Sequence, residues 1–188
     1  VELNTRAKDF AAQFATLLAA RGDSPNDVDS VVAAIVEDVQ RRGDAAVMEY
    51  THKFDRVTVT AETMALSAAQ IDEVAATAPK DAVRALQLAA KRITAYHRKQ
   101  MPAAKSWTDA AGVHLGYRWT AIGSAGLYVP GGTAAYPSSV LMNALPAKVA
   151  GVDRLIMVVP APDGRLNPLV LAAARIAGVD AIYRIGGA

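Results

Sequence analysis

The 188-residue sequence contains no cysteine. This excludes a disulfide scaffold, a zinc or iron–sulfur site built on cysteine, and a cysteine nucleophile within these residues. Long apolar runs are lacking too. The longest strongly apolar stretch, residues 155–159, is far too short to cross a bilayer, and the N-terminus has no signal-peptide pattern. We therefore expect a soluble protein of a reducing compartment, the cytoplasm.

Neither sign of charge dominates the chain. It carries 20 Lys and Arg against 18 Asp and Glu, a net charge of +2, and the two signs are mixed without a long basic run. We therefore expect no nucleic-acid partner and no membrane partner. With 52% hydrophobic residues, the composition is that of a folded globule.

The first half of the sequence has the periodicity of helices. Apolar residues three and four positions apart predict one helix ending at Gly22 and a second that follows a cap at Ser24 and ends at Gly43. Residues 67–70 match a capping box, and Pro79 is expected to open the longest helix. Between them, residues 57–66 are interpreted as a loose segment with room for a short strand.

The period changes to two after Gly112. Alternation over residues 113–120 predicts a half-buried strand, which we expect to form a hairpin with residues 125–129. Helix and strand patterns then alternate. They comprise a helix capped by Ser138 or Ser139 and ending at Ala150, a strand at 155–159, a helix starting at Asn167-Pro168, and a strand at 181–185. The prediction is an α/β fold, in which a helical N-terminal region precedes the start of an incomplete Rossmann-like βαβαβ domain.

The main candidate site follows residues 125–129. The chain passes Tyr128, Pro130, Gly131 and Gly132 and then enters a helix. Glycines let backbone approach a ligand closely, a helix N-terminus favours anionic groups, and the tyrosine ring could stack on a flat ring. A tight βα turn without a ligand explains the same residues equally well.

Two other patterns are interpreted as structural. The three histidines, His52, His97 and His114, lack the spacing of metal ligands. Two Arg-Gly-Asp triplets, at 21–23 and 42–44, combine a helix-ending cation, a glycine stop and a capping aspartate. We assign neither pattern to a binding function.

Six segments carry a specific pattern in colinear order: 42–55, 126–132, 137–151, 158–162, 177–180 and 185–188. Together they resemble the histidinol dehydrogenase family over essentially the whole chain. The resemblance implies a homodimeric enzyme, dependent on NAD and zinc, that oxidises L-histidinol through L-histidinal to L-histidine in the last steps of histidine biosynthesis.

The resemblance also implies how the chain is divided. Residues 1–21 look like a small N-terminal helical piece, 22–127 like the mostly helical first stretch of the main α/β domain, and 128–188 like the first part of a second, Rossmann-like domain that binds NAD. Since the chain stops at Gly186-Gly-Ala, just after a predicted strand, we expect it to be the N-terminal part of a longer polypeptide.

Only part of the family's site carries over. The resemblance assigns NAD contacts to Tyr128 and Pro130, with Gly131 and Gly132 in the same turn. The family's zinc ligands and its catalytic Glu–His pair are expected beyond residue 188. No catalytic residue and no metal ligand is therefore assigned here, and we expect the 188 residues alone to be inactive.

Other functions stay open at this point. An aldehyde-dehydrogenase-like NAD-binding domain has a similar strand end, but usually places Lys or Arg after the next strand, where residues 158–162 read Val-Val-Pro-Ala-Pro. A paralogue that oxidises another small alcohol is a second alternative. A non-enzymatic nucleotide-binding or dimerisation module is a third.

Overall fold

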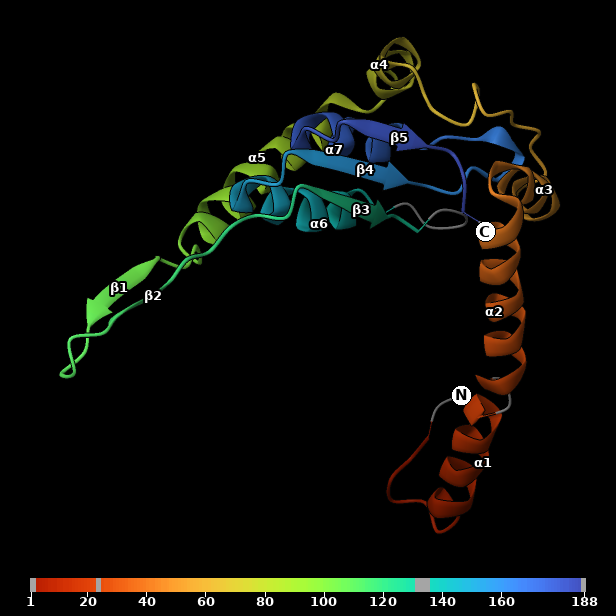
Figure 1. Ribbon diagram of the computed structural model, residues 1–188. Helices are drawn as coiled ribbons and strands as arrows, with labels where there is room; N and C mark the ends of the chain where they lie inside the picture. Colours follow the sequence, from red (N-terminus) through yellow and green to blue (C-terminus); the bar gives the residue numbers. More distant parts are fainter. Residues whose placement is uncertain (1–2, 23–24, 131–135, 187–188) are drawn as a thin grey trace. The chain divides into compact units, whose positions relative to one another are not determined.

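The computed structural model describes residues 3–22, 25–130 and 136–186, with the side chains of 20–22 and 25–27 left aside (Figure 1). The chain divides into two compact units between Ala46 and Val47. None of the helices within the described ranges is both long and apolar enough to cross a bilayer.

The first unit contains two of the predicted helices, α1 (Phe10–Gly22) and α2 (Pro25–Arg42). The predicted cap at Ser24 lies outside the described residues. Gly43 ends α2 with a φ of +59°, a left-handed conformation that glycine adopts without strain. A third helix, α3 (Asp44–Asp55), begins immediately and runs into the second unit.

Two helices of the second unit follow their sequence signals closely. Helix α4 (Ala68–Ala76) starts with the predicted capping box: Gln70 N donates to Ser67 Oγ at 3.2 Å, and Ser67 N donates to Gln70 Oε1 at 2.9 Å. Helix α5 (Lys80–Arg98), with 19 residues, follows Pro79 as expected. The strand suggested for residues 57–66 does not form. A single bridge joins Ala65 to Tyr183, so this segment follows the sheet edge without a ladder.

Three parallel strands form the sheet of the second unit. They are β3 (Ser124–Tyr128), β4 (Arg154–Val158) and β5 (Ala181–Tyr183), in the order β3-β4-β5. Helices α6 (Pro137–Ala150) and α7 (Pro168–Ala177) make the crossovers, which confirms the predicted βαβαβ unit (Figure 1). Both crossovers step in one direction, so the right-handed rule places both helices on the same face.

The core lies between this sheet and its helices. Its fully buried large side chains include Val129, Val140, Leu141, Leu155, Met157 and Leu171. Strand β4 starts at the exposed Arg154 and is apolar from there on, but it is fully buried on one face only: Leu155 and Met157 are buried, whereas Ile156 and Val158 are half-buried.

The predicted hairpin is wrong in partner and in burial. Strand β2 (His114–Tyr117) pairs antiparallel with β1 (Lys105–Thr108), whereas β3 pairs in parallel with β4. Asp109 closes the β1–β2 turn locally, since its Oδ1 accepts the N–H groups of Ala111 and Val113, both at 2.9 Å. All eight residues of the two strands are exposed. The alternating pattern predicted a strand correctly, but it held no information on which segment would pair with it.

The other differences between prediction and structure lie at the ends of helices and strands. Tyr136, rather than Ser138 or Ser139, is the N-cap of α6, because Pro137 takes the first helical position and sets the backbone there. Helix α7 starts at Asn167-Pro168 as predicted, and the Asn167 side chain caps it by accepting from Leu169 N at 2.9 Å. Strand β5 ends at Tyr183, two residues before the predicted limit.

Candidate functional site

The carboxyl ends of β3, β4 and β5 meet at one edge of the sheet, where ligands bind in open α/β folds. Tyr128 ends β3 with 55% of its surface exposed, whereas the preceding Leu127 is buried in the core. Val129 N donates to Val158 O at 3.0 Å and keeps the chain extended up to the exposed Pro130. The structure thus places Tyr128 and Pro130 at this edge. The other predicted site residues, Gly131 and Gly132, lie outside the described residues.

The end of β5 packs directly against the residues that follow β4. Val159 N donates to Tyr183 O at 3.0 Å, one step before Pro160. A Cβ atom added to Gly186 would lie 2.2 Å from Pro160 Cγ, so only glycine fits there without a backbone shift. The carboxyl edge is therefore tightly packed from β4 to Gly186, and this contact was not predicted from the sequence.

Two residues at the end of α3, its last residue Asp55 and the following Arg56, hold the loop that follows β4. Asp55, 5% exposed, accepts the N–H of Ala161 at 3.0 Å through Oδ2. Arg56 makes two bonds to Asp163, Nε to Oδ1 at 2.7 Å and Nη2 to Oδ2 at 3.1 Å. This hydrogen-bonded pair lowers the pKa of Asp163 and raises that of Arg56. The sequence analysis missed these contacts; a local signal existed only in the Pro162-Asp163-Gly164 turn pattern.

The histidines do not assemble into a site. His52 is on α3, His97 on α5 and His114 on β2. The Nδ1 atoms of His52 and His114 lie 3.4 and 3.3 Å from the hydroxyl oxygens of Thr58 and Thr108, respectively. Over residues 3–22, 25–130 and 136–186, no three or more His, Cys, Asp or Glu side chains group so that they could hold a metal ion. These residues do not offer a zinc site.

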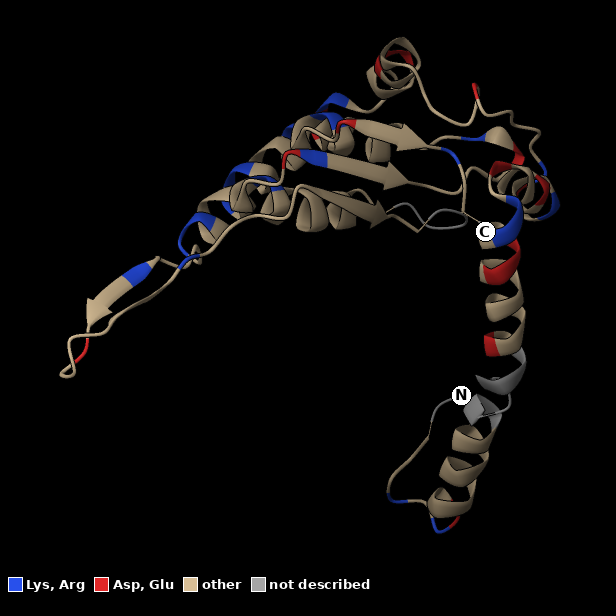
Figure 2. Ribbon diagram, in the orientation of Figure 1, with Lys and Arg blue, Asp and Glu red and all other residues tan. Residues whose placement is uncertain are grey.

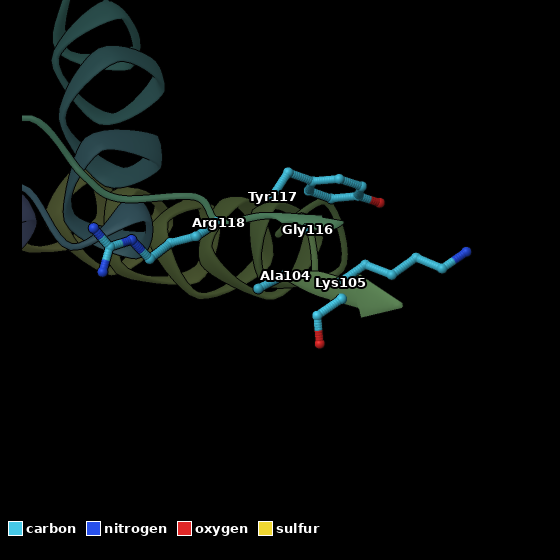
Figure 3. Close-up of a pocket in the computed structure, with 6 residues that line it drawn as sticks. Ala104, Lys105, Gly116, Tyr117 and Arg118 are labelled. Atoms are coloured by element: carbon cyan, nitrogen blue, oxygen red, sulfur yellow. The ribbon is translucent and has the colours of Figure 1, made fainter. Parts of the chain in front are cut away.

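The second unit also has hollows away from this edge. One of about 340 Å³ lies on the β1–β2 hairpin, lined by Ala104, Lys105, Ser106, Gly116, Tyr117 and Arg118. Its Lys105 and Arg118 side chains extend in opposite directions (Figure 3). Lys and Arg residues also recur along α5 (Figure 2). The carboxyl edge is the better candidate, because ligands of open α/β sheets bind at the carboxyl ends of the strands.

Comparison with known proteins points in one direction. A family model described as histidinol dehydrogenase matches residues 19–188. Histidinol dehydrogenase from Rhodospirillum rubrum is 60% identical over 188 residues, covering 100% of this chain and 43% of that protein. The protein of the same name from Cereibacter sphaeroides is 59% identical over 186 residues, covering 99% of this chain and 43% of its own length. The chain thus spans less than half the length of these relatives.

A solved structure agrees with the sequence comparisons. The crystal structure of histidinol dehydrogenase from Elizabethkingia anophelis superposes with a TM-score of 0.81 at 30% identity. The match covers 87% of this chain and 38% of that one. The similarity therefore extends from sequence to the arrangement of helices and strands.

Proposed function

Because the chain belongs to the histidinol dehydrogenase family, we propose that its protein oxidises L-histidinol through L-histidinal to L-histidine with NAD as the oxidant. The observation that carries this proposal is the 60% identity to the Rhodospirillum rubrum protein across the whole of this chain. In this reaction hydride leaves the substrate twice, and water adds to the aldehyde between the two steps.

Docking of NAD is the role that we propose for the carboxyl edge. The exposed ring of Tyr128 is placed to stack on a flat ring of the cofactor, as aromatic side chains do with nucleobases. Pro130 is followed in the sequence by Gly131 and Gly132, which have no side chain and would let the backbone approach the pyrophosphate. Bound NAD would supply the hydride acceptor, and Tyr128 and Pro130 would orient it at this edge.

Zinc, which the family implies, has no matching donor group among the residues that the structure describes. We therefore assign the described residues no step that involves zinc. Nor do we assign them the base for the hydroxyl proton or the group that activates water. We further propose that the protein is a homodimer, as the family resemblance implies. We place it in the cytoplasm, because the reaction draws on the NAD pool of the cell interior.

The test measures NADH absorbance when the full-length gene product, loaded with zinc, is mixed with NAD and L-histidinol. We expect a zinc-dependent rise, and none from the 188 residues alone. A simple aliphatic aldehyde and a second small amino alcohol serve as competing substrates. A faster rate with either of these, or no response to L-histidinol beyond controls, would reject the assignment.

A further inference from the structure

We propose that Asp55 and Arg56 are positioning residues for NAD: they hold residues 160–164 in the conformation that shapes the carboxyl edge of the sheet. This inference rests on the proposed NAD site. It adds a role for a segment that lies far from Tyr128 in the sequence and does not belong to the βαβαβ unit.

The first support is a buried carboxylate with a distant backbone partner. Asp55 is the last residue of α3, and its Oδ2 accepts the N–H of Ala161, 106 positions later in the chain. Ala161 is fully buried. Without the Asp55 carboxylate, the buried N–H of Ala161 would lose its hydrogen-bond partner. Because an unpaired buried N–H is costly, the loop would then favour conformations that expose this N–H to water. The carboxylate therefore selects one conformation of the loop.

The second support is an ion pair between two residues in an unfavourable backbone conformation. Arg56 and Asp163 each have a φ of +56°, and among the described residues no other non-glycine residue has a positive φ. Glycine would adopt this conformation more readily than either. Glycine could not make the two-bond pair between guanidinium and carboxylate, however. The side chains thus maintain two strained turns by connecting them.

The third support is the short path from this clamp to the proposed site. Pro160 directly precedes Ala161, and Gly186, three residues after the end of β5, packs on its ring. Val158, two residues before Pro160 at the end of β4, pairs with Tyr128 on the neighbouring strand β3. A loop released at Ala161 and Asp163 would therefore let Pro160 and the strand ends beside the proposed site move.

The test uses the full-length gene product and measures NAD binding by titration and steady-state kinetics. Asp163→Gly removes the ion pair while relieving the backbone strain. Asp55→Ala removes the acceptor for Ala161 N, whereas Asp55→Asn keeps an oxygen in its place. We expect Asp163→Gly and Asp55→Ala to raise the Kd and KM for NAD about ten-fold, the effect of about 1.4 kcal/mol. Asp55→Asn should stay within about three-fold of the wild type, since its amide oxygen still accepts.

The matched control is Asp72→Ala, which breaks the 2.6 Å ion pair between Asp72 on α4 and Arg175 on α7. Its carboxylate is 55% exposed, close to the 46% of Asp163. This variant should leave the KM for NAD unchanged.

Positioning of NAD predicts a specific split in the kinetics: the KM for NAD rises, while kcat and the KM for histidinol stay near wild type. A merely structural role would lower the active fraction, and hence kcat, without changing the KM for NAD. An unchanged Kd for NAD in Asp163→Gly and Asp55→Ala overturns this inference and leaves the proposed function standing. Failure of the wild type to bind NAD overturns both.

Discussion

Removal of the Tyr128 side chain should weaken NAD binding with little effect on folding. The residue is 55% exposed, so much of its surface is free of contacts with the residues that the structure describes. Stacking of an aromatic side chain on a base contributes about 1–3 kcal/mol, and Tyr128→Ala should therefore raise the Kd for NAD by about ten-fold or more. Tyr128→Phe keeps the ring and should stay within about two-fold of the wild type, because stacking does not need the hydroxyl.

Tyr117 on the β1–β2 hairpin is the matched control. It is 51% exposed and, like Tyr128, ends a strand. Each substitution to alanine should lower the free energy of unfolding by about 1 kcal/mol or less, since both side chains lie largely in solvent. Urea unfolding and calorimetric titration with NAD separate the two effects. The reasoning is refuted if both alanine variants bind NAD as the wild type does, or if both lose affinity equally.

Three further substitutions test packing, charge and close approach. Thr51→Val should leave the free energy of unfolding unchanged or raise it by about 1 kcal/mol in urea unfolding, because the buried Thr51 Oγ1 has no hydrogen-bond partner among the described residues; a clear loss would contradict this. The N–H of Leu155, and next a lysine ammonium, lower the pKa of Asp180 below its ordinary 3.8. The stabilisation from the Asp180 carboxylate is therefore complete above the unfolded-state pKa of about 3.8 and is lost as pH falls through the lower folded-state pKa. The free energies of unfolding of the wild type and Asp180→Asn should accordingly converge as the pH falls through this range; a constant difference between them at all pH values would refute the linkage. Gly186→Ala should lower the free energy of unfolding by about 1–3 kcal/mol in thermal or urea unfolding, since the new Cβ would overlap the rigid ring of Pro160; wild-type stability would show that the backbone around Gly186 moves away from Pro160 at no cost.

The elements that the sequence predicted well are those whose signals act within one or two helical turns. The capping box at Ser67, the glycine stop at Gly43 and the helix start at Asn167 each satisfy backbone groups close by in the chain, and the structure confirms all three. The crossover unit was predicted for a related reason. Short apolar strands that alternate with helices have few alternatives to a parallel sheet.

The exposed hairpin shows where this reasoning fails. Alternation over residues 113–120 indicated a strand, but pairing with β1 instead of β3 depends on which partner is free in three dimensions. Half-burial was inferred from the same alternation. Burial requires another layer on the apolar face, and within the described residues β1 and β2 have no such cover.

The sequence by itself determined the family, most of the helix limits and the position of Tyr128 at a strand end, because each is encoded in residues close together in the chain. The tertiary structure decided the rest of the carboxyl edge. Asp55 and Ala161 are 106 positions apart, and Gly186 packs on Pro160 only because parallel strands bring their carboxyl ends to one edge. A hydrogen bond between such distant residues has no periodicity and no local signature, so it becomes visible only when the fold brings them together.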